Sequence, residues 1–93
     1  MYICFAEYKI LEEYREPFTS YTKLLLKDLP HVTLYEGTDQ PNLFVEVWQA
    51  ADAEEAERMK EERCNERSPW FPITDWIAGG AGKLHVWTFK PVH

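Results

Sequence analysis

The segment Asn42–Ala50, with the sequence NLFVEVWQA, alternates aliphatic residues with aromatic and ionisable ones. A second segment, Leu84–Lys90 (LHVWTFK), alternates in the same way. Side chains of a β-strand point in turn to the two faces of its sheet, so each segment predicts a strand with one aliphatic face and one aromatic, ionisable face. The aliphatic faces hold Leu43, Val45, Val47, Leu84 and Val86, and the aromatic faces hold Phe44, Glu46, Trp48, His85, Trp87 and Phe89.

The remaining elements follow from changes in the hydrophobic period. Alternation predicts a first strand at Tyr2–Lys9, and apolar residues recurring every three or four positions then predict a helix from about Glu13 to Asp28. Further strands are predicted at residues 31–36, 42–50 and 84–90, and a second helix begins near residue 52. The order β-α-β-β-α-β is that of a ferredoxin-like α+β fold with a four-stranded antiparallel sheet, in a single domain over residues 1–93.

The second helix has a defined start and a thin apolar stripe. Asp52 and Glu55 have the spacing of a capping box, in which Asp52 accepts hydrogen bonds from first-turn amides. The stripe consists of Ala53, Ala56, Met59 and then Arg63 or Cys64. Beyond this helix, Trp70 and Trp76 are predicted either to pack over its open end or to form a lid over a cavity.

Composition and charge exclude several classes of function. The chain of 93 residues has a formal net charge of −6 and no basic cluster, which argues against nucleic acid and anionic membrane surfaces as partners. No apolar run approaches the ~18 residues that span a bilayer, and the segment MYICFAEYK does not resemble a signal peptide, so a cytoplasmic location is expected. Cys4 and Cys64 are predicted to be reduced packing residues.

The predicted sheet needs a second covering layer. Two helices cover one face of a four-stranded sheet, and a large aromatic patch is rarely left exposed on a monomer. If the aliphatic residues pack on the helices, the aromatic set must face another subunit. The sequence therefore predicts a homodimer in which two sheets face each other.

The chain resembles the dimeric α/β-barrel proteins, which include antibiotic-biosynthesis monooxygenase-like, stress-responsive barrel and NIPSNAP-like groups. The resemblance rests on the element order, the strand VEVW (45–48), the helix start ADAEEAERMK (51–60) and the ending KLHVWTFKPV (83–92). It implies a homodimer whose packed sheets enclose a cavity. Members of the superfamily use this cavity for cofactor-independent oxygenation, haem breakdown or other small-molecule chemistry.

The aromatic face is the predicted site for a small apolar or aromatic molecule. In the first strand, small Cys4 and Ala6 suit the helix side, which leaves Glu7 on the cavity face. Glu46 and His85 are the candidate acid/base pair, because a carboxylate among aromatic rings loses hydration and its pKa rises toward that of a general base. The predicted ligand-binding residues are Glu7, Tyr35, Phe44, Trp48 and Trp87.

Other interpretations of these residues stay open. Glu46 and His85 can instead be buried for structural reasons, with the aromatic face a packed dimer core and the protein a structural or ligand-sensing module without enzymatic activity. No metal or cofactor is expected. The alternatives are a metal site at Glu7, Glu46 and His85, and haem bound through His31 or His85, although no haem-attachment motif is present.

Overall fold

The computed structural model describes residues 1–93 in full. Four strands, two α-helices and three short 3₁₀-helices make up the chain. In chain order they are β1 (Tyr2–Lys9), η1 (Glu12–Tyr14), α1 (Arg15–Leu26), β2 (Val32–Gly37), β3 (Gln40–Ala50), α2 (Ala53–Arg63), η2 (Phe71–Trp76), η3 (Ala81–Lys83) and β4 (His85–Phe89). Neither α-helix is both long and apolar enough to cross a lipid bilayer.

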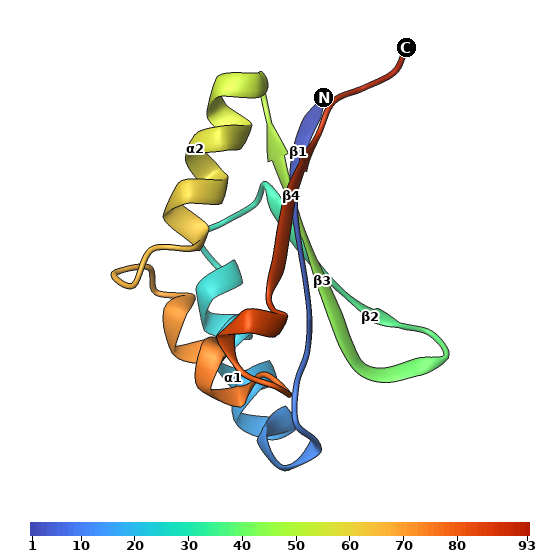
Figure 1. Cartoon of the computed structure of the whole chain (residues 1–93), viewed down its shortest axis with the longest axis vertical. Helices are drawn as coiled ribbons and strands as arrows, with labels where there is room; N and C mark the ends of the chain where they lie inside the picture. The colour runs from blue at the N-terminus through green and yellow to red at the C-terminus, as the bar shows by residue number, and fades with distance from the viewer.

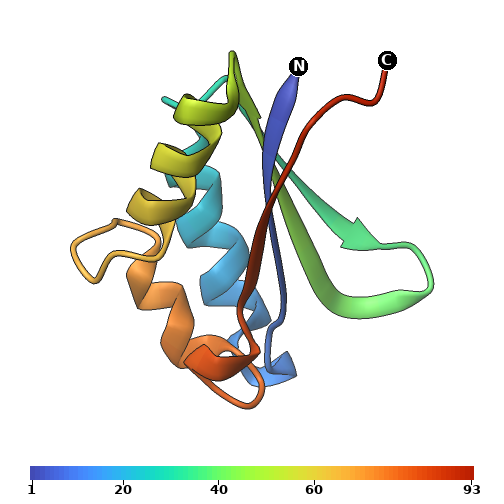
Figure 2. The same cartoon turned by 45° about the horizontal axis from the view of Figure 1, so that its top comes forward.

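The four strands form one antiparallel sheet in the order β2-β3-β1-β4. Both α-helices lie on the same side of this sheet, and the other side is uncovered (Figure 1 and Figure 2). The predicted ferredoxin-like α+β fold is therefore confirmed.

The predicted element boundaries hold with small shifts. Strand β3 begins two residues earlier than expected, because the turn after β2 is confined to Thr38 and Asp39. Helix α2 begins after Asp52, whose side chain accepts a hydrogen bond from the amide of Glu55 at 2.8 Å. This is the predicted cap, and it satisfies one of the amides that a helix start leaves unpaired.

Strand register decides which residues meet the helices. In β1 the buried residues are Cys4, Ala6 and Tyr8, so the prediction that Cys4 and Ala6 face the helices is confirmed. Cys4 lies opposite Trp48 and Ala6 opposite Glu46, and residues directly opposite each other share a face of the sheet.

The predicted orientation of β3 is consequently wrong. Phe44, Glu46 and Trp48 face the helices and are buried, whereas the aliphatic residues between them point to the uncovered side. Side-chain volume favours this orientation of β3. Small side chains on β1 and a thin stripe on α2 leave space that only large residues on β3 fill to the density of a protein interior.

Aromatic residues build much of the core between sheet and helices. Phe18 of α1 packs against Phe44 with ring centroids 4.4 Å apart and against Tyr8 at 5.8 Å. Cys4 is a buried packing residue, as predicted, and burial together with the nearby Glu46 raises the pKa of its thiol to about 11. Cys64 is exposed, so its predicted packing role is wrong: it follows the last buried residue of α2.

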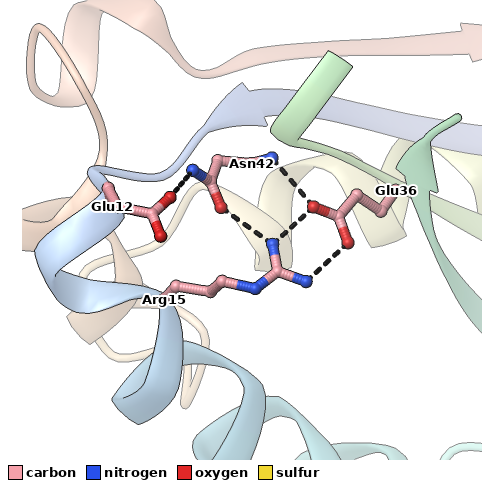
Figure 3. A network of polar contacts seen from close by, with 4 residues as sticks. All are labelled: Glu12, Arg15, Glu36 and Asn42. Carbon is pink, nitrogen blue, oxygen red and sulfur yellow. Dashed lines mark hydrogen bonds and ion pairs between the residues drawn. The ribbon is translucent and has the colours of Figure 1, made fainter. Parts of the chain in front are cut away.

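A polar network fastens the β2–β3 hairpin to the start of α1 (Figure 3). Arg15 forms a two-pronged ion pair with Glu36, and its Nη1 also donates to Oδ1 of Asn42 at 2.8 Å. Asn42 adopts a left-handed backbone conformation with φ 70°. Its backbone N–H donates to Glu36 at 2.8 Å, and its side-chain Nδ2 donates to Glu12. The network thus joins four elements, η1, α1, β2 and β3, at one end of the sheet.

This network predicts an acid-sensitive contribution to stability. The Arg15 guanidinium and the Asn42 amide lower the pKa of Glu36 from 4.5 to about 2. A carboxylate with a lowered folded-state pKa stabilises the fold above its unfolded pKa, and this stabilisation is lost as the pH falls from about 4.5 to about 2. Urea unfolding should show a shallower loss of stability over that window for Glu36→Gln than for the wild type. Glu13→Gln, at an exposed position without such partners, should keep the wild-type slope, and an unchanged slope for Glu36→Gln would contradict the prediction.

Candidate functional site

Glu46 is sealed in the interior, with none of its surface exposed. Its carboxylate accepts four hydrogen bonds, from Tyr8 Oη at 2.6 Å, Trp48 Nε1 at 2.8 Å, Arg63 Nε at 2.7 Å and Arg63 Nη2 at 2.8 Å. The three partner residues supply four donor groups, so the carboxylate acts only as an acceptor and its lone pairs are occupied. It is a structural group that joins the sheet to α2.

The charges of this cluster stabilise one another. Burial lowers the pKa of Arg63, but hydrogen bonds and charge from Glu46 outweigh that effect and the net pKa is raised. Burial and the Glu46 carboxylate together hold the pKa of Tyr8 well above its ordinary value. The guanidinium also lies over the rings of Tyr8 and Trp70, 5.8 and 5.2 Å from their centroids. Arg63 therefore stays charged in the interior, with a carboxylate on one side and aromatic faces around it.

The uncovered face of the sheet retains four of the seven predicted site residues. Glu7 and His85 are cross-strand partners on β1 and β4, and the ring of His85 stacks on Trp87 with centroids 5.6 Å apart. Trp87 in turn lies 5.9 Å from Phe5. Tyr35 of β2 pairs with Val45 and so shares this face.

The structure separates the predicted acid/base pair. Glu46 lies on the helix side with Phe44 and Trp48, whereas His85 lies on the uncovered side with Glu7, Tyr35 and Trp87. The predicted shared surface for Glu46 and His85 is therefore wrong, and the cause is the inverted orientation of β3.

The alternative metal set is divided in the same way. Glu46 is on one face of the sheet, and Glu7 and His85 are on the other. No group of three or more His, Cys, Asp or Glu side chains lies close enough together to hold a metal ion. His31, the other histidine considered for haem, packs edge-to-face against Trp48 at 5.9 Å.

A cavity of about 390 Å³ lies on the helix side, beside the C-terminal end of α2. It lies within the size range of small-molecule sites, about 300–1,000 Å³. Its lining combines one aliphatic residue and two tryptophans with two arginines and several other polar groups. The lining residues are Leu29, Trp48, Glu62, Arg63, Asn65, Arg67, Ser68, Pro69 and Trp70.

The loop after α2 forms one wall of this cavity and is held in place by hydrogen bonds. The Asn65 side chain accepts from the amide of Arg67 at 2.8 Å, and the Ser68 hydroxyl accepts from the amide of Trp70 at 3.1 Å. Tyr21 of α1 donates to the carbonyl of Pro69, which fastens the loop to the first helix. The cavity is thus bounded by anchored segments of the chain.

The two tryptophans after α2 have separate roles. Trp70 is buried at the end of α2, 5.5 Å from Trp48, so its predicted packing against that helix is confirmed. Trp76 packs instead on the first helical region, stacked on Tyr14 at 6.4 Å and edge-to-face with Tyr21 at 6.0 Å.

One signal in the sequence indicates the observed orientation of β3. Arg63 falls on the predicted buried stripe of α2, and a buried guanidinium needs an acidic partner. Glu46, the one charged residue of β3 and flanked on both sides by apolar residues, is the natural partner. An ion pair between Glu46 and Arg63 predicts that Glu46 faces the helices, and because side chains alternate along a strand, Trp48 must then face them too.

Neither protein-family models nor curated protein sequences match this chain. Solved structures do match it in fold. A Nitrosomonas europaea protein provisionally described as an antibiotic biosynthesis monooxygenase has a TM-score of 0.71 and 17% identity over 100% of both chains. A second structure described as an antibiotic biosynthesis monooxygenase has a TM-score of 0.68 and 16% identity, also over 100% of both chains. A structural-genomics protein from Agrobacterium tumefaciens has a TM-score of 0.63 and 12% identity, over 99% of this chain and 94% of its own.

The chain therefore has the ferredoxin-like fold of the antibiotic-biosynthesis-monooxygenase-like proteins. The predicted resemblance to this superfamily is confirmed at the level of the fold. At these identities the likeness concerns backbone architecture, and chemistry has to be argued from the residues of this chain.

Proposed function

We propose that this protein binds a small, mainly apolar or aromatic molecule in the cavity beside the end of α2. The observation that carries the proposal is the cavity of about 390 Å³ next to Trp48, Arg63 and Trp70. Apolar walls with a few convergent polar groups are the usual composition of a small-molecule site. The sequence placed this ligand on the aromatic face of the sheet, and the proposal moves it to the helix side together with Trp48.

The proposal concerns binding and not a reaction. Glu46 has no free lone pair, and His85 lies across the sheet from it, so the cavity lacks the predicted acid/base pair. Cofactor-independent oxygenation stays a prediction from the resemblance, as does a cytoplasmic location.

Binding of neutral indole tests the location of the site. Titration into ¹⁵N-labelled protein should shift the indole N–H signals of Trp48 and Trp70, with a dissociation constant of about 1 mM for so small a ligand. Leu29→Trp, which fills part of the cavity, should weaken binding at least about tenfold. Leu24→Trp is the matched control, because Leu24 is exposed on α1 and does not line the cavity. Equal affinity for both variants, or shifts confined to Trp87, would contradict this location.

We also propose that the protein is a homodimer built through the uncovered face of the sheet. Trp87 and Phe89 are 43% and 49% exposed there and pack around Phe5. The ionisable side chains of β1 and β4 on this face are Glu7, Lys9 and His85, and the other four residues of these strands on the face are apolar, namely Ile3, Phe5, Trp87 and Phe89. An apolar area of this kind favours association, and two copies facing each other would cover both areas by symmetry.

Sedimentation equilibrium tests the homodimer directly. The wild type should sediment as a species of twice the chain mass of 11.0 kDa at micromolar concentrations. Trp87→Glu places a charge beside Phe5 and Phe89 on the uncovered face and should weaken association by at least about 30-fold, the effect of losing a residue that dominates an interface. Leu24→Glu makes the same change on the opposite side and should leave the dimer intact. A wild type that stays monomeric at high micromolar concentration would refute the homodimer.

A further inference from the structure

We propose that the ligand of this cavity is an aromatic carboxylate, with the carboxylate held by Arg63 and Arg67. The inference rests on the proposed function, since it assigns a chemical class to the molecule bound at the same site. Its basis is the distribution of hydrogen-bond donors and acceptors around the cavity.

Arg63 uses only two of its three guanidinium nitrogens in hydrogen bonds to Glu46. The residue is 2% exposed, and its Nε and Nη2 donate to the two oxygens of Glu46. Its remaining terminal nitrogen, Nη1, makes no hydrogen bond to Glu46, and the residue lines the cavity. A guanidinium fixed on one side by a carboxylate is a preorganised donor for a second anion, because its orientation is already determined.

The other polar groups of the cavity add donors. The guanidinium of Arg67 makes no hydrogen bond or ion pair within the chain. Asn65 and Ser68 use their side-chain oxygens to accept from backbone amides, which leaves the Asn65 amide nitrogen and the Ser68 hydroxyl hydrogen to donate. Glu62 is the one acidic residue of the lining, so donors outnumber acceptors and favour a ligand that carries a negative charge.

Trp70 contributes a second, independent observation. Its indole Nε1 is the one buried side-chain nitrogen or oxygen in the chain without a hydrogen-bond partner. An unsatisfied buried donor is unfavourable in the folded state, and Trp70 lines the cavity. The Nε1 atom itself is buried, so a bound acceptor would supply the missing partner after a small rotation of the indole toward the cavity.

The apolar residues of the lining favour a ligand whose uncharged part is aromatic. Leu29, Pro69 and the two tryptophans supply apolar contact, and the indole rings favour an aromatic molecule through stacking or edge-to-face packing. An aromatic ring bearing one carboxylate matches both the apolar walls and the donor-rich portion.

Paired probes test the inference, namely indole-3-carboxylate and its neutral counterpart indole-3-carboxamide. Titrated into the ¹⁵N-labelled full chain, the carboxylate should bind at least about tenfold more tightly than the carboxamide, because its hydrogen bonds are charge-assisted. Both probes should shift the Trp48 and Trp70 indole signals, and the Trp70 signal should move further with the carboxylate.

Substitutions at three exposed positions should weaken, strengthen and leave unchanged the affinity for the carboxylate. Arg67→Gln should weaken the carboxylate about three- to tenfold and leave the carboxamide unchanged. Glu62→Gln removes the competing charge and should strengthen the carboxylate by about threefold. Arg58→Gln, on α2 but outside the cavity lining, should change neither affinity.

Two negative results distinguish the carboxylate inference from the proposed function. Equal affinity for the two probes, with no effect of Arg67→Gln, would overturn the carboxylate inference and leave small-molecule binding in place. If neither probe, nor neutral indole, shifts the Trp48 and Trp70 signals, both the inference and the proposed function fall.

Discussion

The buried ion pair between Glu46 and Arg63 is the interaction on which the rest of the structure depends. Two charges out of water are unfavourable unless each is paired and hydrogen-bonded, and this requirement fixes where β3 and α2 lie relative to each other. Glu46 meets it with four donors drawn from three elements. Because a strand alternates its side chains, turning Glu46 toward α2 also turns Phe44 and Trp48 inward. One pairing thereby sets the composition of both faces of the sheet.

The two faces consequently have different uses. On the helix side, Trp48 joins Trp70 and Arg63 around a cavity whose loop wall is anchored to α1 through Tyr21. On the other side, Trp87 and Phe89 remain exposed around Phe5. We propose a small molecule as the occupant of the helix side and a second copy of the chain as the partner of the uncovered side. The ion pair also fixes the guanidinium of Arg63, a residue that lines the cavity, so the proposed ligand site shares a residue with the core.

The element order and the fold were predictable from the sequence, because hydrophobic period, the Asp52 cap and the turn residues are local signals. The faces of β1 and β4 were also predictable. The orientation of β3 was not, since aliphatic and aromatic residues both satisfy a buried face and the choice depends on register and on Arg63, 17 residues away from Glu46. The predicted site therefore kept Glu7, Tyr35, His85 and Trp87 together and lost Glu46, Phe44 and Trp48. The loop wall formed by Asn65 and Ser68 depends on turn geometry that no periodic pattern encodes.

A double-mutant cycle on Glu46 and Arg63, followed by urea unfolding at neutral pH, tests the central claim most directly. Removing one partner leaves an uncompensated buried charge, so Glu46→Gln and Arg63→Met should each lower the free energy of unfolding by about 3–5 kcal/mol. The double variant should lose far less than the sum of the two, because neither charge remains. Glu54→Gln with Arg58→Met, an exposed pair on α2, provides the control and should be additive within about 0.5 kcal/mol. Single losses below about 1 kcal/mol that add in the double variant would show that this pair does not hold α2 to the sheet.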